Sequence, residues 1–164
     1  MRSFGVFLVF SALAGAAILA ALLVAFFSSG GSGHPLIGDH WHATYDYIVC
    51  GEARPNAPFW EAGIRTDGDG IIHIDPFNDA EEGRGARLVK WFEYGGGVLT
   101  ADEVRLPGDE VTYRNGDRCQ DGGEGLLQVF VTPRATGVEE DLEDWSGYIP
   151  QDGDRVVVSF GTKP

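Results

Sequence analysis

Four side chains with metal-binding chemistry fall in two short segments of the chain. His40 and His42 are two residues apart, and so are His73 and Asp75. In an extended strand, residues at i and i+2 point to the same face, so each pair presents its side chains together. If the two strands are neighbours with matching faces, three imidazoles and one carboxylate converge. Such a ligand set suits Zn²⁺, and imidazole-rich sites also take copper.

The alternative interpretation of these residues is an ordinary polar strand face. Pairs of the His-x-His type arise by chance, and an exposed face accepts His and Asp without any metal. Convergence depends on the register between the two strands. The sequence does not fix that register, and a slip of one residue turns every side chain to the other face.

The segment Asp67-Gly68-Asp69-Gly70 combines carboxylates with glycines just before His73. It lacks the spacing and the final Glu of an EF-hand calcium loop. Carboxylates and glycines also build ordinary tight turns. We therefore predict a turn here rather than a calcium site.

Sequence motifs for catalysis are missing from the chain. There is no G-x-S-x-G elbow, no phosphate-binding glycine loop and no H-E-x-x-H pair. With 25 acidic residues, pairs of carboxylates are too common to indicate a glycosidase. The prediction is a non-enzymatic protein with no catalytic residue and no organic cofactor.

The elements that position these residues follow from hydrophobic periodicity and turn signals. Leu88, Trp91 and Phe92 lie at i, i+3 and i+4, and a run of three glycines ends that segment, which predicts a short helix. Alternating or β-branched runs predict strands elsewhere. The expected strands are residues 40–50, 71–75, 111–114, 126–132 and 155–160, and the expected helix is 87–94.

This order of elements predicts an α+β fold, in which one short helix packs on a mixed sheet. The pattern is compatible with a β-grasp-like arrangement. The helical face of Leu88, Trp91 and Phe92 is expected to belong to the core.

Two cysteines, Cys50 and Cys119, are the only ones in the chain. In an oxidising compartment such a pair is usually one disulfide, so we predict a Cys50–Cys119 bond. Closing so long a loop stabilises by up to about 4 kcal/mol in the chain-entropy model. A two-cysteine metal site is the less favoured alternative.

The first part of the chain is an apolar run from Phe4 to Phe27 without a single charge. As a helix this run would be roughly 36 Å long, enough to cross a bilayer core of ~30 Å. A cleaved signal peptide is the alternative, but its apolar region is shorter and ends in small residues, whereas this run ends in Phe26 and Phe27. We predict a single transmembrane anchor over residues 1–27, a flexible tether over 28–36 and a folded domain over 37–164.

Orientation and partners follow from the charges. Arg2 is the only charged side chain in the first 27 residues, so the N-terminus is expected to stay cytoplasmic and the domain to lie outside the cytoplasm. The chain carries a net charge of −13. Such an acidic surface argues against binding nucleic acid. The expected location is the cell membrane, with another membrane or cell-envelope protein as a possible partner.

The chain resembles a family of uncharacterised, membrane-anchored bacterial proteins, mostly from high-GC Gram-positive bacteria. Members carry the segments D-W-H-A, Y-x-V-C-G, G-I-H-T-H-G-D-G-x-I-H-I-H-P-F and Y-x-x-G-D-x-C. The matching segments here are residues 39–43 (DHWHA), 47–51 (YIVCG), 63–77 (GIRTDGDGIIHIDPF) and 113–119 (YRNGDRC). The resemblance implies an anchored outer domain with a matched pair of cysteines, and it implies no activity.

The chain departs from this motif at three histidine positions, where it has Arg65, Asp67 and Asp75. A guanidinium does not ligate metal at ordinary pH and repels a cation. If the family binds metal through those histidines, the site in this chain is altered. Carboxylates at Asp67 and Asp75 would supply harder oxygen ligands and shift the preference away from copper.

Two functions are therefore open. The first is a membrane-tethered, non-enzymatic module that interacts with another protein or has a structural role. The alternative is a domain that binds zinc or copper through His40, His42, His73 and Asp75.

Overall fold

The computed structural model describes residues 33–162 of the chain. The predicted anchor, residues 1–27, and most of the predicted tether lie outside these described residues. Among residues 33–162, no helix has both the length and the apolar character needed to cross a membrane. The packed chain begins inside the range predicted as tether, since Pro35 is buried and its carbonyl accepts a hydrogen bond from the Gly83 N–H (2.8 Å).

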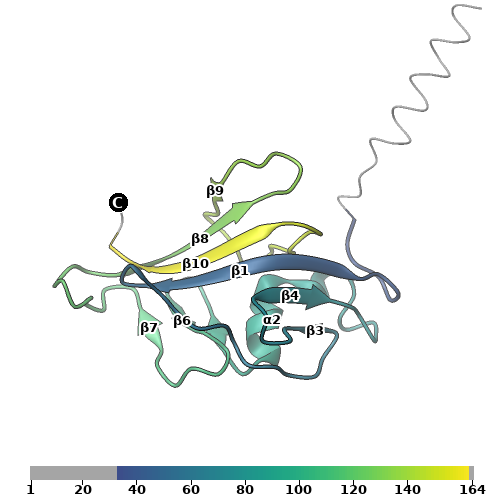
Figure 1. Cartoon of the computed structure of the whole chain (residues 1–164), viewed down its shortest axis with the longest axis horizontal. Coiled ribbons are helices and arrows are strands. Elements are labelled where there is room, and N and C mark those ends of the chain that lie inside the picture. The colour runs from purple at the N-terminus through teal and green to yellow at the C-terminus, as the bar shows by residue number, and fades with distance from the viewer. Residues whose placement is uncertain (1–32, 163–164) are drawn as a thin grey trace, which may run out of the picture. The chain divides into compact units, whose positions relative to one another are not determined.

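The main sheet is mixed, as predicted. Its central strands, β1 and β10, run parallel, and every other neighbouring pair is antiparallel. The strands follow the order β3-β4-β1-β10-β8-β9, and β2 pairs with the end of β1 (Figure 1). Their bounds are β1 Trp41–Val49, β2 Glu52–Ala53, β3 Ile64–Arg65, β4 Ile71–Ile74, β8 Leu126–Thr132, β9 Glu140–Asp141 and β10 Arg155–Gly161.

The short helix was also predicted. It is α2 (Leu88–Tyr94), preceded by a 3-10 turn, η1 (Gly83–Ala86). Leu88, Trp91 and Phe92 are buried, and the helix ends at Gly95. Figure 1 shows α2 beside β4 and β1. The Trp91 ring meets the Tyr45 ring of β1 with centroids 4.8 Å apart, so the helix packs on one face of the main sheet.

A second, three-stranded sheet was not predicted. It consists of β5 (Val98–Leu99), β6 (Glu103–Arg105) and β7 (Tyr113–Arg114) in that order. Strands of two or three residues carry too little alternation to be recognised in a sequence. For the same reason β2, β3 and β9 were not predicted. The strand predicted over residues 111–114 begins two residues before β7.

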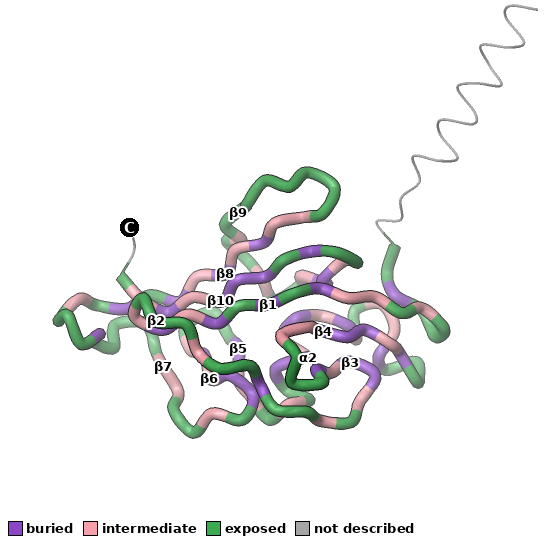
Figure 2. Tube along the Cα trace, in the orientation of Figure 1, coloured by how far each residue is buried: buried purple, intermediate pink, exposed green. Residues whose placement is uncertain are grey.

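The core lies on the face of the main sheet that α2 covers. Burial alternates along β1: Ala43, Tyr45, Tyr47 and Val49 are buried, whereas Thr44 and Asp46 are exposed (Figure 2). This alternation is the one expected of a strand with one buried face. The side chains of His40 and His42 therefore emerge on the opposite face, away from the core.

The predicted disulfide is present between Cys50 and Cys119, whose Cα atoms are 5.5 Å apart. It joins the residue after β1 to the loop after β7. There is no free cysteine among the described residues, which removes the alternative of a two-cysteine metal site.

Candidate metal centre

The register between β1 and β4 brings the predicted histidines together. His42 lies directly opposite His73 in this antiparallel pair, and Ala43 lies opposite Ile72. Ala43 and Ile72 are buried in the core. Directly opposed residues share a face, so His42 and His73 point away from the core together, and His40 joins them two residues earlier.

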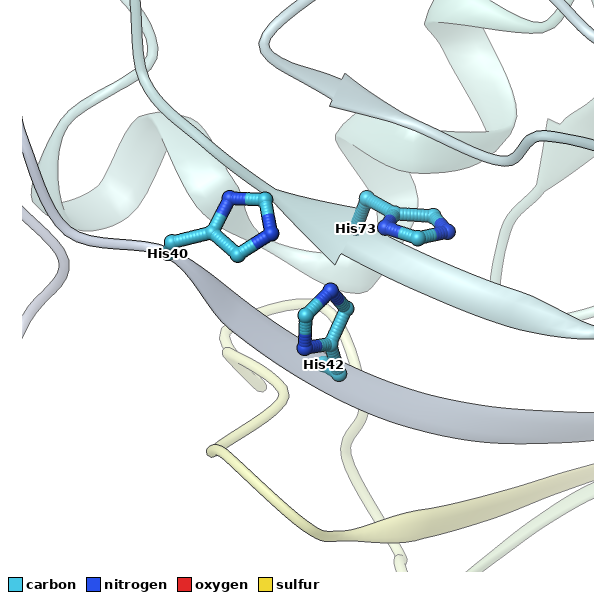
Figure 3. Close-up of side chains that lie close together, drawn as sticks. All are labelled: His40, His42 and His73. Atoms are coloured by element: carbon cyan, nitrogen blue, oxygen red, sulfur yellow. The ribbon is translucent and has the colours of Figure 1, made fainter.

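The three imidazoles form a compact cluster. Ring centroids are 4.5 Å apart for His40 and His42, and 4.8 Å apart for His42 and His73. One ring nitrogen from each residue can be chosen so that all three lie within 4.8 Å of one another. In Figure 3 the three rings surround a common space. Tetrahedral zinc with Zn–N bonds of 2.0–2.1 Å needs nitrogens about 3.3 Å apart, so a bound ion would draw the rings together by up to about 1.5 Å.

The three histidines differ in solvent exposure, from His73 near the protein interior to His40 at the surface. The His73 side chain is only 10% exposed, whereas that of His40 is 53% exposed. His42 is intermediate. An ion would therefore meet His40 first and His73 at the base of the site. The fourth histidine, His34, does not belong to the cluster.

Asp75, the fourth predicted ligand, lies at the edge of the cluster. Its Oδ2 is 3.6 Å from Nδ1 of His40 and also 3.6 Å from Nη1 of Arg65. β4 ends at Ile74, and the carboxylate of Asp75 lies next to His40 and Arg65, near the face that strand alternation predicted. The three groups whose ligand atoms converge are the histidines, without Asp75.

Asp69, which the sequence assigned only to a turn, contacts the cluster directly. Its Oδ2 lies 3.1 Å from Nε2 of His73. Its Oδ1 accepts a hydrogen bond from the N–H of Ile71 at 3.1 Å and one from the Thr66 hydroxyl at 3.4 Å. The turn after β3 therefore holds this carboxylate against His73. The only signal in the sequence was the short interval between Asp69 and His73.

Two more charged groups border the site. Arg65 of β3 lies opposite His73 and pairs with Asp67 (3.3 Å) as well as with Asp75. Asp152, from the turn before β10, accepts a hydrogen bond from the backbone N–H of His42 at 3.0 Å. No pattern in the sequence indicated Asp152, because its position depends on the parallel pairing of β1 with the last strand.

The electrostatics of the cluster favour the protonation states that a metal requires. Burial, then repulsion from His73 and His40, lowers the pKa of His42. Burial alone would raise the pKa of Asp69, but hydrogen bonds from His73 and from the Ile71 N–H outweigh it, and the pKa is lowered. A neutral imidazole and an ionised carboxylate are the forms that bind and support metal ions.

Comparison with known proteins adds no assignment to this geometry. No protein-family model, no curated protein and no solved structure matches the chain.

Proposed function

We propose that this domain binds one divalent transition-metal ion, zinc or copper(II), through His40, His42 and His73. The observation that carries the proposal is the convergence of three imidazole nitrogens within 4.8 Å on two paired strands. Three protein ligands leave a fourth position for water or another group, as in zinc sites with three histidines.

The donor set limits the choice of metal. Imidazole nitrogen suits Zn²⁺ and Cu²⁺, whereas Cu⁺ prefers thiolate or thioether sulfur. Both cysteines are consumed by the disulfide, and Met1 is the only methionine of the chain. Hard ions such as Ca²⁺ and Mg²⁺ prefer an all-oxygen shell. The proposal is therefore restricted to zinc and oxidised copper.

The surrounding charges also favour a cation. Four carboxylates border the three imidazoles, and two guanidinium groups pair with some of them. The carboxylates are Asp67, Asp69, Asp75 and Asp152, and the guanidiniums are Arg65 and Arg134. With neutral histidines this leaves an excess of negative charge, which attracts a positive ion.

Isothermal titration calorimetry of the full chain in detergent tests the proposal, with zinc and copper(II) titrated separately. We expect one ion per chain, and we expect His42→Ala and His73→Ala to weaken binding by at least about tenfold. His34→Ala is the matched control, because His34 is exposed and outside the cluster. Equal affinity in His34→Ala and His73→Ala, or no saturable binding by the unmodified chain, would refute the metal site.

A role in protein interaction is a second proposal, and it is compatible with metal binding. Large apolar side chains are more than half exposed, which favours contact with a partner: Leu36 (57%), Ile37 (53%), Phe59 (62%) and Phe77 (58%). We propose a non-enzymatic module that contacts another membrane or cell-envelope protein. Photo-crosslinking from position 77 in intact cells should yield a discrete adduct that a crosslinker at exposed Glu61 does not give. Identical patterns from the two positions would contradict this role.

We propose that the chain is a single-pass membrane protein with a cytoplasmic N-terminus and an outer domain. The apolar run from Phe4 to Phe27 and the positive charge of Arg2 support this topology. The Cys50–Cys119 disulfide supports an external domain, since disulfides persist in oxidising compartments. Protease added to intact cells should remove the domain, and survival until the membrane is permeabilised would reverse the orientation.

We further propose that the domain is β-grasp-like. In support, the first and last long strands are parallel at the centre of the sheet, and α2 follows β4, an antiparallel neighbour of β1, in the chain. A four-residue β4 and the added three-stranded sheet would be elaborations of that plan.

A further inference from the structure

His73 has one ring nitrogen with a partner and one without. Its Nε2 lies 3.1 Å from Oδ2 of Asp69, and 3.6 Å from Oδ2 of Asp67. An ionised carboxylate can only accept a hydrogen bond. The proton of a neutral His73 therefore sits on Nε2, where it is donated to Asp69, and Nδ1 keeps its lone pair.

The Nδ1 atom of His73 is buried and has no hydrogen-bond partner among the described residues. Leaving a buried polar atom unpaired costs free energy, so such atoms are rare unless something else satisfies them. In Figure 3 the ring of His73 lies beside those of His40 and His42, with a nitrogen turned toward them. With Nε2 engaged by Asp69, the nitrogen that faces the cluster is Nδ1.

We propose that Asp69 is a positioning residue that holds His73 in the Nε2–H tautomer, so that Nδ1 is the atom of His73 that binds the metal. This inference rests on the metal-binding function proposed above. The arrangement is a carboxylate–histidine–metal relay, in which the outer carboxylate fixes the ring and makes the ligating nitrogen more basic. Asp69 itself does not touch the metal in this scheme.

The turn explains why Asp69 rather than Asp67 has this role. Both oxygens of Asp69 are engaged, since Oδ1 accepts from Ile71 and Thr66 while Oδ2 faces His73. Asp67 is further from His73, at 3.6 Å, and pairs with Arg65. Asp67 is therefore a suitable comparison. It is an aspartate of the same turn and lies close to the same ring, but it forms no hydrogen bond with that ring.

Asp69→Asn has a specific consequence. If the amide oxygen keeps the hydrogen bonds from Ile71 and Thr66, the NH₂ group faces Nε2 of His73 and donates to it. The proton of His73 must then move to Nδ1, which blocks the lone pair that the metal needs. The substitution preserves the size of the side chain and the hydrogen bonds of the turn.

The test combines NMR of the metal-free protein with zinc titration. Long-range ¹H–¹⁵N correlation spectra report which nitrogen of His73 is protonated. We expect the Nε2–H tautomer in the unmodified chain and in Asp67→Asn, and the Nδ1–H tautomer in Asp69→Asn. Zinc affinity should fall about 10–100-fold in Asp69→Asn. Asp67→Asn removes the same charge from beside the ring but leaves the proton on Nε2, so its loss of affinity should be several times smaller.

The outcomes separate the two proposals. An Nδ1–H tautomer in the unmodified, metal-free chain overturns the role of Asp69, and so does equal zinc affinity in the two aspartate variants. An Nε2–H tautomer in a chain that binds no zinc refutes the metal site while the assignment of the proton stands. The NMR spectra also show whether each variant is folded.

Discussion

Each histidine of the cluster has a different environment, and these differences decide how the site would bind a metal. His73 is held from behind by Asp69, whereas His40 is more than half exposed and near Asp75. His42 lies between them and is fixed through its backbone by Asp152. A buried ligand fixed by a hydrogen bond, together with an exposed ligand at the surface, is typical of a site that an ion can enter from solvent.

The sequence predicted the three histidines but not the carboxylate that supports them. The i, i+2 spacing was sufficient for His40 and His42, because strand alternation is a local property. The contact between Asp69 and His73 depends on how the turn at residues 67–70 folds back onto β4, the strand that follows it. Asp75 was predicted as a ligand from its spacing to His73. It lies against His40, but Arg65 shares its carboxylate, and it is not among the groups whose ligand atoms converge.

Zinc affinity should depend on pH in a direction that these residues fix. Metal replaces the proton on an imidazole lone pair, so binding weakens as the pH falls. The lowered pKa of His42 keeps that ring neutral further into the acid range than a free imidazole. We expect little change between about pH 8 and about pH 7, and a loss of at least tenfold by about pH 5.

Calorimetry in buffers with different ionisation enthalpies would measure both the affinity and the protons released. Release of protons that grows as the pH falls supports imidazole ligands. An affinity that is unchanged between about pH 7 and about pH 5 would point instead to a site made of carboxylates.

The β3–β4 hairpin carries His73, and a buried carboxylate ties its two ends together. Glu81 is only 5% exposed. Its Oε1 accepts a hydrogen bond from the Gly63 N–H (3.0 Å), and its Oε2 accepts one from the Phe77 N–H (2.8 Å). A Cβ at Gly63 would lie 2.3 Å from Oε2 of Glu81, so only glycine permits this approach.

Glu81→Gln should destabilise the domain by about 1–3 kcal/mol, because one end of the amide turns a donor toward a backbone N–H. Glu61→Gln is the control, since Glu61 is exposed and forms no hydrogen bond or ion pair among the described residues. Urea unfolding followed by tryptophan fluorescence measures both variants. Equal urea midpoints for the two variants would show that the hydrogen bonds of Glu81 contribute nothing to stability.

At the level of elements, the helix and the strands of four or more residues were predicted, whereas among the strands of two or three residues only β7 was found, within a longer predicted strand. β8 was predicted with the correct bounds, and β1, α2 and β10 to within one residue at either end. Their alternation or periodicity extends over seven or more residues. The register that pairs His42 with His73 required the whole sheet, because neither strand specifies its neighbour by itself.

Across the whole domain, the disulfide and the histidine cluster are at opposite ends of β1. His42 and Cys50 are eight residue steps apart along extended chain, which is about 26 Å. The disulfide constrains the unfolded chain, whereas the histidine cluster depends on the pairing of β1 with β4. Stability and metal binding should therefore respond separately to loss of the bond.

Replacing both cysteines by alanine should cost about 2–4 kcal/mol in unfolding free energy. Zinc affinity of the folded variant should stay within about twofold of the unmodified chain. Chemical denaturation and calorimetry on the same sample measure both. A variant that remains folded but loses zinc would show that the disulfide supports the metal site from a distance.

X-ray absorption at the zinc edge is the decisive experiment for the histidine cluster, because it identifies the atoms bound to the metal. For the full chain loaded with one equivalent of zinc, we expect three imidazole nitrogens at about 2.0–2.1 Å, with the outer-shell scattering typical of histidine rings. The fourth neighbour is a light atom such as a water oxygen. A spectrum with oxygen neighbours and no imidazole scattering would contradict the assignment of this cluster as a metal centre.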